Sequence, residues 1–430
     1  MFQKNKDIPY QADEKAINNI NQANQKSLEI LQSTNPILVD VRTAIDVVPN
    51  MDSNLILASG PPMSWKEYRG GQKNAILGGA VHEGLADTKE KAEEEIEKGN
   101  IQVSSCQEYN CVGSLAGIYT ASMPVLVVED TVSGNRSFCT LFEGSSPYRL
   151  NYGSYNSEVE NNLLYLKEVI APVLGEVIRE AGSIELKPIM KRALHMGDEL
   201  HSRNTAATAL FVRELIPYLV NQSHKGGEIN KLIDYLLTGD YFFLRLSMAA
   251  AKVSISQISN IPYSTIVSSM AFSCSKFGIK IASSDKWFYG SLPHLEHYHI
   301  NKNHSEDEIE FMGGESIVME TFGLGSFAQV AAFPLQAYQG GSPEKMIENN
   351  NRMYEITVGE HKDFKIPYFQ YKGTPLGIDI RSVLEKEITP TLDIGIASEK
   401  GMQIGAGLAV SPIDSFESAS NYFYDKYLAT

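Results

Sequence analysis

A block of helical periodicity in the middle of the chain restricts the folds that this sequence can adopt. Between residues 158 and 220, apolar side chains recur at intervals of three and four, first along Val159, Leu163, Leu166, Ile170, Val173, Leu174 and Val177. This spacing gives each helix one apolar stripe, which other elements must cover. Because residues 231–238 and 242–258 continue the pattern, we expect a helical region over residues 151–260.

Mixed helix and strand patterns flank this helical region on both sides. Before it, we expect a polar helix at residues 10–34, strands at 37–41, 54–58, 101–104 and 123–128, and a charged helix at 88–99. After it, we expect a serine-rich helix at 264–277, a strand at 278–282 and a histidine-rich loop at 290–310. The sequence therefore predicts a multi-domain α+β fold, with a mixed α/β domain at residues 1–150, the helical region at 151–260 and a mixed α+β domain at 261–430.

The charge and hydropathy of the chain argue against two classes of partner. Asp and Glu number 52 against 37 Lys and Arg, and no stretch combines basic and aromatic residues as a nucleic-acid surface would. The first residues lead into polar sequence, and no apolar run approaches the roughly 20 residues of a membrane span. We therefore expect neither nucleic-acid nor membrane partners. The four cysteines are too few and scattered for a disulfide framework, so we expect a cytoplasmic protein.

The segment from Met196 to Thr205 contains the polar residues best suited to catalysis. If it continues the helix before it, Asp198 and His201 lie on one inward-facing stripe. A buried imidazole beside a carboxylate can act as an oriented acid or base with a pKa near neutrality. The alternative is a structural network in which Asp198 pairs with Arg203.

Three other segments are candidates for ligand binding. Residues 320–328 match a G-x-G-x-x-A pattern, but the following region does not resemble the rest of a dinucleotide-binding unit, so a backbone anion site or a simple turn is favoured. Glu143 and Arg149 lie near an expected domain boundary, where an arginine can clamp a carboxylate. His294, His297, His299 and His304 lie in a polar segment, which favours a solvated loop over a metal site.

Several short motifs resemble, in order and spacing, the AllG/YlbE family from about residue 37 to the C-terminus. They are Gly60-Pro61-Pro62, Val112-Gly113 with Ala116-Gly117, Glu143-Gly144, residues 196–204, Phe242-Phe243 with residues 248–250, residues 320–325 and residues 373–379. The resemblance implies a three-part α+β architecture and a subunit of oxamate carbamoyltransferase, which moves a carbamoyl group between oxalurate or oxamate and phosphate in anaerobic allantoin breakdown. It also implies FdrA-like and other neighbour-encoded partner chains, and we expect self-association as well.

The implied reaction needs groups that bind carboxylate and phosphate, donors for a developing oxyanion and an acid for the departing nitrogen. We therefore expect His201 to be the acid/base group, Asp198 its orienting carboxylate, and Arg203 and Arg149 the anion clamps. The other expected substrate- or anion-binding residues are Gly60, Pro61, Gly113, Gly117, Glu143, Asn204, Glu320, Gly323 and Gly325. No cofactor or metal ion is expected.

Three alternatives to this function stay open at the level of the sequence. The chain could be a noncatalytic scaffold or small-anion-binding subunit that supports an FdrA-like partner, or a related transferase with a different small carboxylate substrate. A metalloenzyme would need at least three of the four clustered histidines to converge. The catalytic and scaffold hypotheses differ in whether polar groups converge on one anion-sized cavity that contains His201.

Overall fold

A computed structural model describes residues 14–221, 226–398 and 401–429. Its first sheet is antiparallel, with the strand order β5 (Arg136–Thr140), β4 (Pro124–Asp130), β1 (Pro36–Thr43) and β6 (Ile184–Glu185). Beside it, β2 (Leu55–Ala58) pairs in parallel with β3 (Gln102–Ser105). These strands are rich in Val, Leu and Ile, which suit buried strands, and they confirm the four strands expected before residue 150.

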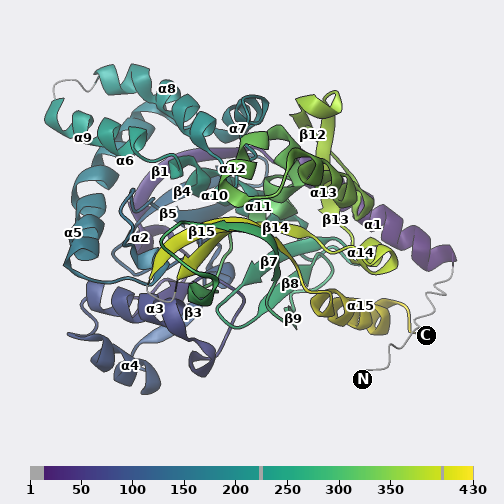
Figure 1. The fold of residues 1–430 in the computed structure, drawn as a ribbon, viewed down its shortest axis with the longest axis horizontal. Coiled ribbons are helices and arrows are strands. Elements are labelled where there is room, and N and C mark those ends of the chain that lie inside the picture. The colour runs from purple at the N-terminus through teal and green to yellow at the C-terminus, as the bar shows by residue number, and fades with distance from the viewer. Residues whose placement is uncertain (1–13, 222–225, 399–400, 430) are drawn as a thin grey trace.

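The middle of the chain is helical, as predicted (Figure 1). Its helices are α5 (Ser157–Tyr165), α6 (Ala171–Ala181), α7 (Leu186–His195), α8 (Thr205–Asn221), α9 (Gly226–Leu237) and α10 (Phe242–Ile255). Every residue of α10 is buried, and this helix packs against β4 and β5 on one side and α8 and α11 (Val318–Thr321) on others. Any charged residue in α10 is therefore held inside the molecule.

The last third of the chain contains two further sheets and a hairpin. Strands β7 (Val267–Phe272), β8 (Phe277–Ile281) and β9 (Phe288–Gly290) form one antiparallel sheet, and β10 (His294–Ile300), β15 (Met402–Val410), β14 (Thr391–Ser398) and β11 (Ile309–Glu310) form the other, in these orders. Strands β12 (Thr357–Ile366) and β13 (Lys372–Ile378) form the hairpin. The remaining helices are α1 (Glu14–Ser33), α2 (Ala44–Val47), α3 (Gly70–His82), α4 (Lys89–Glu97), α12 (Gln336–Gln339), α13 (Pro343–Glu355), α14 (Ile380–Lys386) and α15 (Asp414–Tyr427).

Two expected elements of the last third are wrong. The serine-rich segment 264–277 contains strand β7 instead of a helix, because all six residues of β7 are buried between layers where small serine and alanine side chains fit. The expected histidine-rich loop contains strand β10, which has a register shift between Leu295 and His297 and whose side chains are exposed or only partly buried. Residues 10–13 of the expected N-terminal helix lie outside the described residues, and α1 confirms the rest.

Elements distant in sequence share one core. The largest hydrophobic cluster joins Leu28 of α1, Leu126 of β4 and Leu246 of α10 to Leu376 of β13. Helix α1 lies beside β12 and β13 at one side of the molecule (Figure 1). The fold is α+β as predicted, while the division at residues 150 and 260 stays a prediction.

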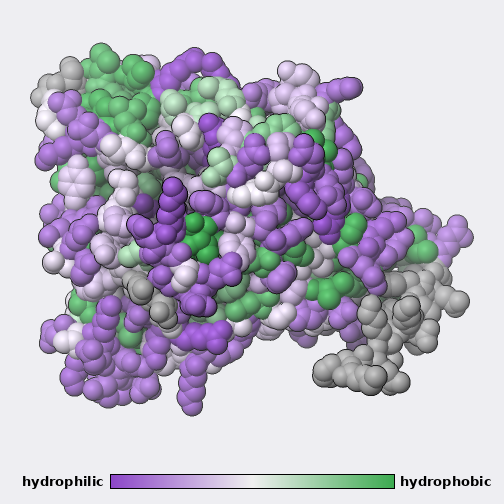
Figure 2. Space-filling view, in the orientation of Figure 1, coloured by the Kyte–Doolittle hydropathy of each residue, from purple (hydrophilic) through white to green (hydrophobic). Residues whose placement is uncertain are grey.

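The surface carries one feature relevant to assembly. Figure 2 shows hydrophobic side chains gathered over α8 and α9, on a face that is otherwise largely hydrophilic. Ile216 and Val220, one turn apart on α8, are 50% and 64% exposed. Within the described ranges, no helix combines the length and apolar character that crossing a bilayer requires.

Candidate functional site

A cavity of about 60 Å³ lies where the 196–204 loop, α10 and the β14–β15 hairpin meet. Its polar lining residues are Ser114, Tyr152, His201, Ser202, Tyr241, Arg245, Ser316, Tyr338 and Gln403. Neither aspartate nor glutamate is among the residues that line it within the described chain. A single water needs about 10–15 Å³ by the same measure, so this space can accept a small molecule.

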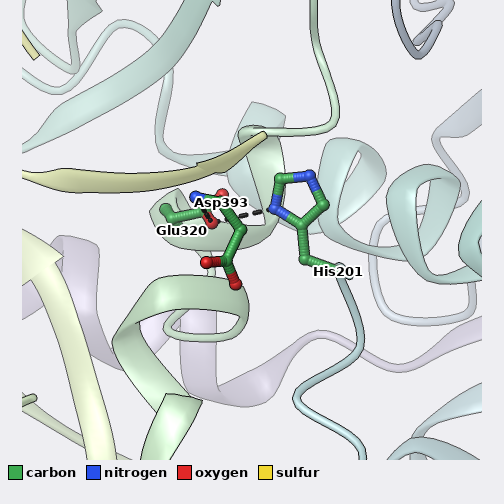
Figure 3. Close-up of side chains that lie close together, drawn as sticks. All are labelled: His201, Glu320 and Asp393. Carbon is green, nitrogen blue, oxygen red and sulfur yellow. Dashed lines mark hydrogen bonds and ion pairs between the residues drawn. The ribbon is translucent and has the colours of Figure 1, made fainter. Parts of the chain in front are cut away.

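His201 lines this cavity and is fixed from behind by Glu320. The His201 Nδ1–H donates to Glu320 Oε1 over 2.9 Å (Figure 3). Glu320 Oε1 also accepts the backbone N–H groups of Ser326 and Asp393, each over 3.1 Å, so it cannot easily turn away. The other ring nitrogen, Nε2, forms no hydrogen bond to any described residue. The ring therefore has one anchored edge and one edge free for a ligand.

The charge around the ring favours its protonated form. Burial alone would lower the pKa of His201, but the contact with Glu320 and the charge of Asp393 raise it above its ordinary value. A histidine of this kind holds a proton near neutral pH and can deliver it to a bound molecule.

The expectation that Asp198 and His201 share a helical face is wrong. Helix α7 ends at His195, and positive φ angles at Gly197 and Leu200 turn the chain away from a helical path. Asp198 instead accepts hydrogen bonds from Arg203 Nη1 over 2.6 Å and from the Ala207 N–H of α8 over 2.8 Å. Asp198 thus stabilises the loop and the start of α8, and Glu320 occupies the place beside His201.

The backbone N–H groups at Gly60 and Gly113 already have an acceptor within the protein. Both donate to the buried carboxylate of Glu315, over 3.1 and 2.8 Å. Burial raises the pKa of Glu315 to about 8, against the lowering effects of its hydrogen bonds. Gly117 is a close-packing position, since a Cβ there would lie 2.7 Å from Ser59 Cβ, and Pro61 packs near Gly278 of β8. The structure does not bring these four residues into the cavity lining.

The backbone N–H groups of the glycine turn at residues 323–325 also have acceptors within the protein. The Gly323 N–H donates to the Glu320 carbonyl and the Gly325 N–H to the Glu199 carbonyl, over 3.2 and 2.8 Å. The Glu199 carboxylate accepts the N–H groups of His201, Ser202 and Arg203 and so shapes the loop below the cavity. A buried N–H group needs an acceptor, and here side chains and carbonyls of the chain supply it.

The two predicted anion clamps lie beside the cavity but do not line it. Arg149 Nη1 donates to the Tyr152 hydroxyl over 2.6 Å, and its guanidinium lies 4.7 Å from the centre of that ring. Tyr152 in turn donates to Gln403, so Arg149 positions part of the cavity wall. Arg203 and Asn204 line a neighbouring cavity of about 170 Å³.

Two further predicted residues hold loops in place. Asn204 Nδ2 donates to the His201 carbonyl over 2.9 Å, which fixes the loop that carries the histidine. The buried carboxylate of Glu143 accepts the N–H groups of Leu150 and Asn151 over 2.6 and 3.0 Å, just before α5. Both side chains thus hydrogen-bond to backbone groups of nearby loops.

Arg245 is the charged residue of this cavity that the sequence analysis missed. It belongs to α10, is 4% exposed and lines the same cavity as His201. Its Nε and Nη1 atoms have no hydrogen-bond partner among the described residues. The available signal was a lone charge within the apolar run 242–246, because a charged residue inside a buried helix requires a partner.

A cluster of carboxylates lies beneath His201. Glu199, Glu320 and Asp393 are all buried, and ligand atoms of His201, Glu320 and Asp393 lie within 4.8 Å of one another, as a metal ion would require. Burial and the charge of Glu320 raise the pKa of Asp393 to about 7, and burial with the charge of Asp393 raises that of Glu199. The cluster can therefore store a proton or hold a cation. The histidines at 294–304 form no such group within the described ranges.

The fold and the cavity define an α+β protein with a small internal site lined by hydrogen-bonding side chains and one arginine. A family model described as oxamate carbamoyltransferase subunit AllG matches residues 101–316. The chain is 33% identical over 404 residues to the oxamate carbamoyltransferase subunit AllG of Escherichia coli (strain K12), covering 93% of this chain and 96% of the relative. This chain belongs to the AllG family.

Two other relatives extend the comparison over almost the whole chain. The uncharacterized protein YahG of Escherichia coli (strain K12) is 33% identical over 423 residues, which are 97% of this chain and 88% of the relative. A crystal structure of a conserved protein of unknown function from Enterococcus faecalis V583 has a TM-score of 0.93 and 31% identity, and covers 96% of this chain and 99% of that one.

Proposed function

We propose that this chain is a subunit of an oxamate carbamoyltransferase-like enzyme of anaerobic allantoin catabolism, acts in the cytoplasm, and contributes the cavity at His201 to the reaction. The observation that supports it is His201 itself, since Glu320 anchors one ring nitrogen and the other has no partner among the described residues of this cavity. Membership of the AllG family and the name of the E. coli relative support the choice of reaction.

In this proposal His201 moves the proton that the reaction requires. A phosphate oxygen attacks the carbamoyl carbon of oxalurate, and the bond between that carbon and the oxamate nitrogen breaks. His201 gives a proton to the departing nitrogen and recovers one from the attacking hydrogen phosphate, which leaves carbamoyl phosphate and oxamate. Glu320 keeps the ring oriented and holds its pKa high enough for the first step.

The same geometry favours a catalytic subunit over a noncatalytic scaffold. Donor groups from four parts of the chain, at Ser114, His201, Arg245 and Gln403, converge on one small space. A scaffold needs no such convergence. A noncatalytic small-anion-binding subunit would share it, and the activity of the reconstituted complex separates that alternative. A related transferase with another small carboxylate substrate fits the same cavity. The assay distinguishes the two functions by comparing oxamate with other small carboxylates.

We also propose that the chain works in an assembly with FdrA-like and other neighbour-encoded subunits and associates with its own kind. The name of the E. coli relative as a subunit supports this, and so does the exposed apolar face of α8 at Ile216 and Val220.

The test is reconstitution. The chain is co-expressed with its genomic neighbours, the complex is purified, and carbamoyl phosphate is measured from oxalurate and phosphate. Oxamate and carbamoyl phosphate are used for the reverse reaction, with other small carboxylates as alternative acceptors. We expect activity that depends on this chain. A complex that is equally active without it would refute the catalytic proposal, and activity only with another acceptor would identify the related transferase.

A further inference from the structure

The cavity contains a buried cation that the described part of the chain leaves without an anion. Arg245 forms no ion pair with any described carboxylate. It interacts with the buried Cys139 thiol, but its Nε and Nη1 atoms have no hydrogen-bond acceptor among the described residues. A guanidinium withdrawn from water in this way is strongly destabilising unless an anion accompanies it. A buried arginine in this state is suited to pair with an anion that enters the cavity from outside.

A buried carboxylate that feels the charge of Arg245, Glu143, already accepts other hydrogen bonds. Both oxygens of Glu143 accept backbone hydrogen bonds, from Leu150 and Asn151. Burial raises the pKa of Glu143 despite those bonds and the charge of Arg245. No carboxylate lines the cavity among the described residues, so an incoming anion would not contact one directly.

We propose that Arg245 anchors a small planar carboxylate of the size of oxamate in this cavity. This inference rests on the proposed function, which places the reacting end of the ligand at His201. The planar fork of a guanidinium matches the two oxygens of a carboxylate. The rings of Tyr152, Tyr241 and Phe272 supply flat walls, and the space of about 60 Å³ excludes a large ligand.

The test measures binding by the isolated full-length chain. Isothermal titration calorimetry is carried out with oxamate, with oxamide as the neutral analogue of the same shape, and with inorganic phosphate. We expect saturable binding of oxamate and at least about tenfold weaker binding of oxamide. Arg245→Met should weaken oxamate binding about ten- to hundredfold, which is typical of lost hydrogen bonds to a charged group.

The thermal midpoint without ligand separates a binding role from a structural one. Because Arg245→Met removes an unpaired buried charge, its midpoint should equal or exceed that of the wild type. Lys187→Met is the matched control, since Lys187 is a buried cation with a partner, Asp363, at 3.1 Å. That variant should lose stability and keep oxamate binding. Arg245→Lys keeps the charge without the fork and serves if the methionine variant does not fold.

Several results would overturn the inference: no saturable binding of oxamate by the wild type, unchanged oxamate affinity in Arg245→Met, or equal affinities for oxamide and oxamate. Binding of phosphate without binding of oxamate would also overturn it. Failure of the proposed function looks different. A reconstituted complex without carbamoyl transfer, together with Arg245-dependent binding of oxamate, refutes the reaction and leaves the binding site intact.

Discussion

Replacement of His201 by glutamine separates a catalytic role from a structural one. The ring donates one hydrogen bond, to Glu320 Oε1 over 2.9 Å, and that oxygen keeps two backbone donors if the ring is lost. A glutamine amide can also donate to it. The free energy of unfolding should therefore change by less than about 1 kcal/mol, compared with about 1–3 kcal/mol when a buried polar group is left without a partner.

The effect on turnover should be much larger. Glutamine can hydrogen-bond but cannot give and recover a proton, and loss of a general acid typically costs about 100- to 10,000-fold in rate. This corresponds to roughly 3–5 kcal/mol of activation free energy. The assay compares carbamoyl transfer by the reconstituted complex with the thermal midpoint of the same preparation. Retained turnover with a lowered midpoint would refute the reasoning.

Glu320→Gln provides a second test of the same pair. Glu320 raises the pKa of His201, so removing its charge should lower that pKa. Since the proposed acid must be protonated, turnover falls as the pH rises through its pKa. In the variant this fall should occur at a lower pH than in the wild type. An unchanged pH profile would show that His201 is not the titrating group.

Three further predictions concern the carboxylates and the surface. Burial raises the pKa values of Asp198, Asp393 and Glu315 to about 6, 7 and 8, so the folded chain keeps protons that the unfolded chain loses near pH 4. The thermal midpoint should therefore decrease as the pH is raised from about 5 to about 8.5. Asp393→Asn should lessen this fall, and a flat pH profile would contradict it. Elemental analysis should find no stoichiometric divalent metal, because a metal ion would have to break the hydrogen bond between His201 Nδ1 and Glu320 Oε1. One bound zinc that His201→Gln removes would contradict this. Val220→Lys should weaken association in light scattering, whereas the equally exposed control Val132→Lys should not; equal effects would exclude α8 as the interface.

Helices α1 and α4 and the helices of the middle region were predictable because their signals are local, whereas the glycine-rich helix α3 (Gly70–His82) was not expected. Helix α4 follows Thr88, whose hydroxyl accepts the Lys91 N–H, and it ends just before Gly99. Strand β7 was not predictable in this way, since its serines are buried by layers formed from distant residues. The break at Gly197 and Leu200 was missed because apolar spacing continues across it, although a glycine in that position is a signal of helix termination.

The pairing of His201 with Glu320 could not be predicted from spacing, because 119 positions separate the two residues. The family-like motifs did contain both of them. What the sequence could not reveal is which of its polar groups satisfy one another, since that depends on tertiary contacts. Helical periodicity predicted that Asp198 lies beside His201, but in the loop Asp198 accepts hydrogen bonds from Arg203 and from the first turn of α8.

The hydrogen-bond partners of the polar groups favour Arg245, and not the predicted glycines, as the ligand-binding residue. Glu315, Glu320, Glu199 and Glu143 each accept backbone N–H groups that would otherwise suit an external anion. A ligand that took these N–H groups would have to displace a buried carboxylate, which would then lose its hydrogen bonds. At Arg245 no carboxylate of the chain has to be displaced. An anion that enters this cavity can pair with the buried guanidinium, and it does so within the same space as His201.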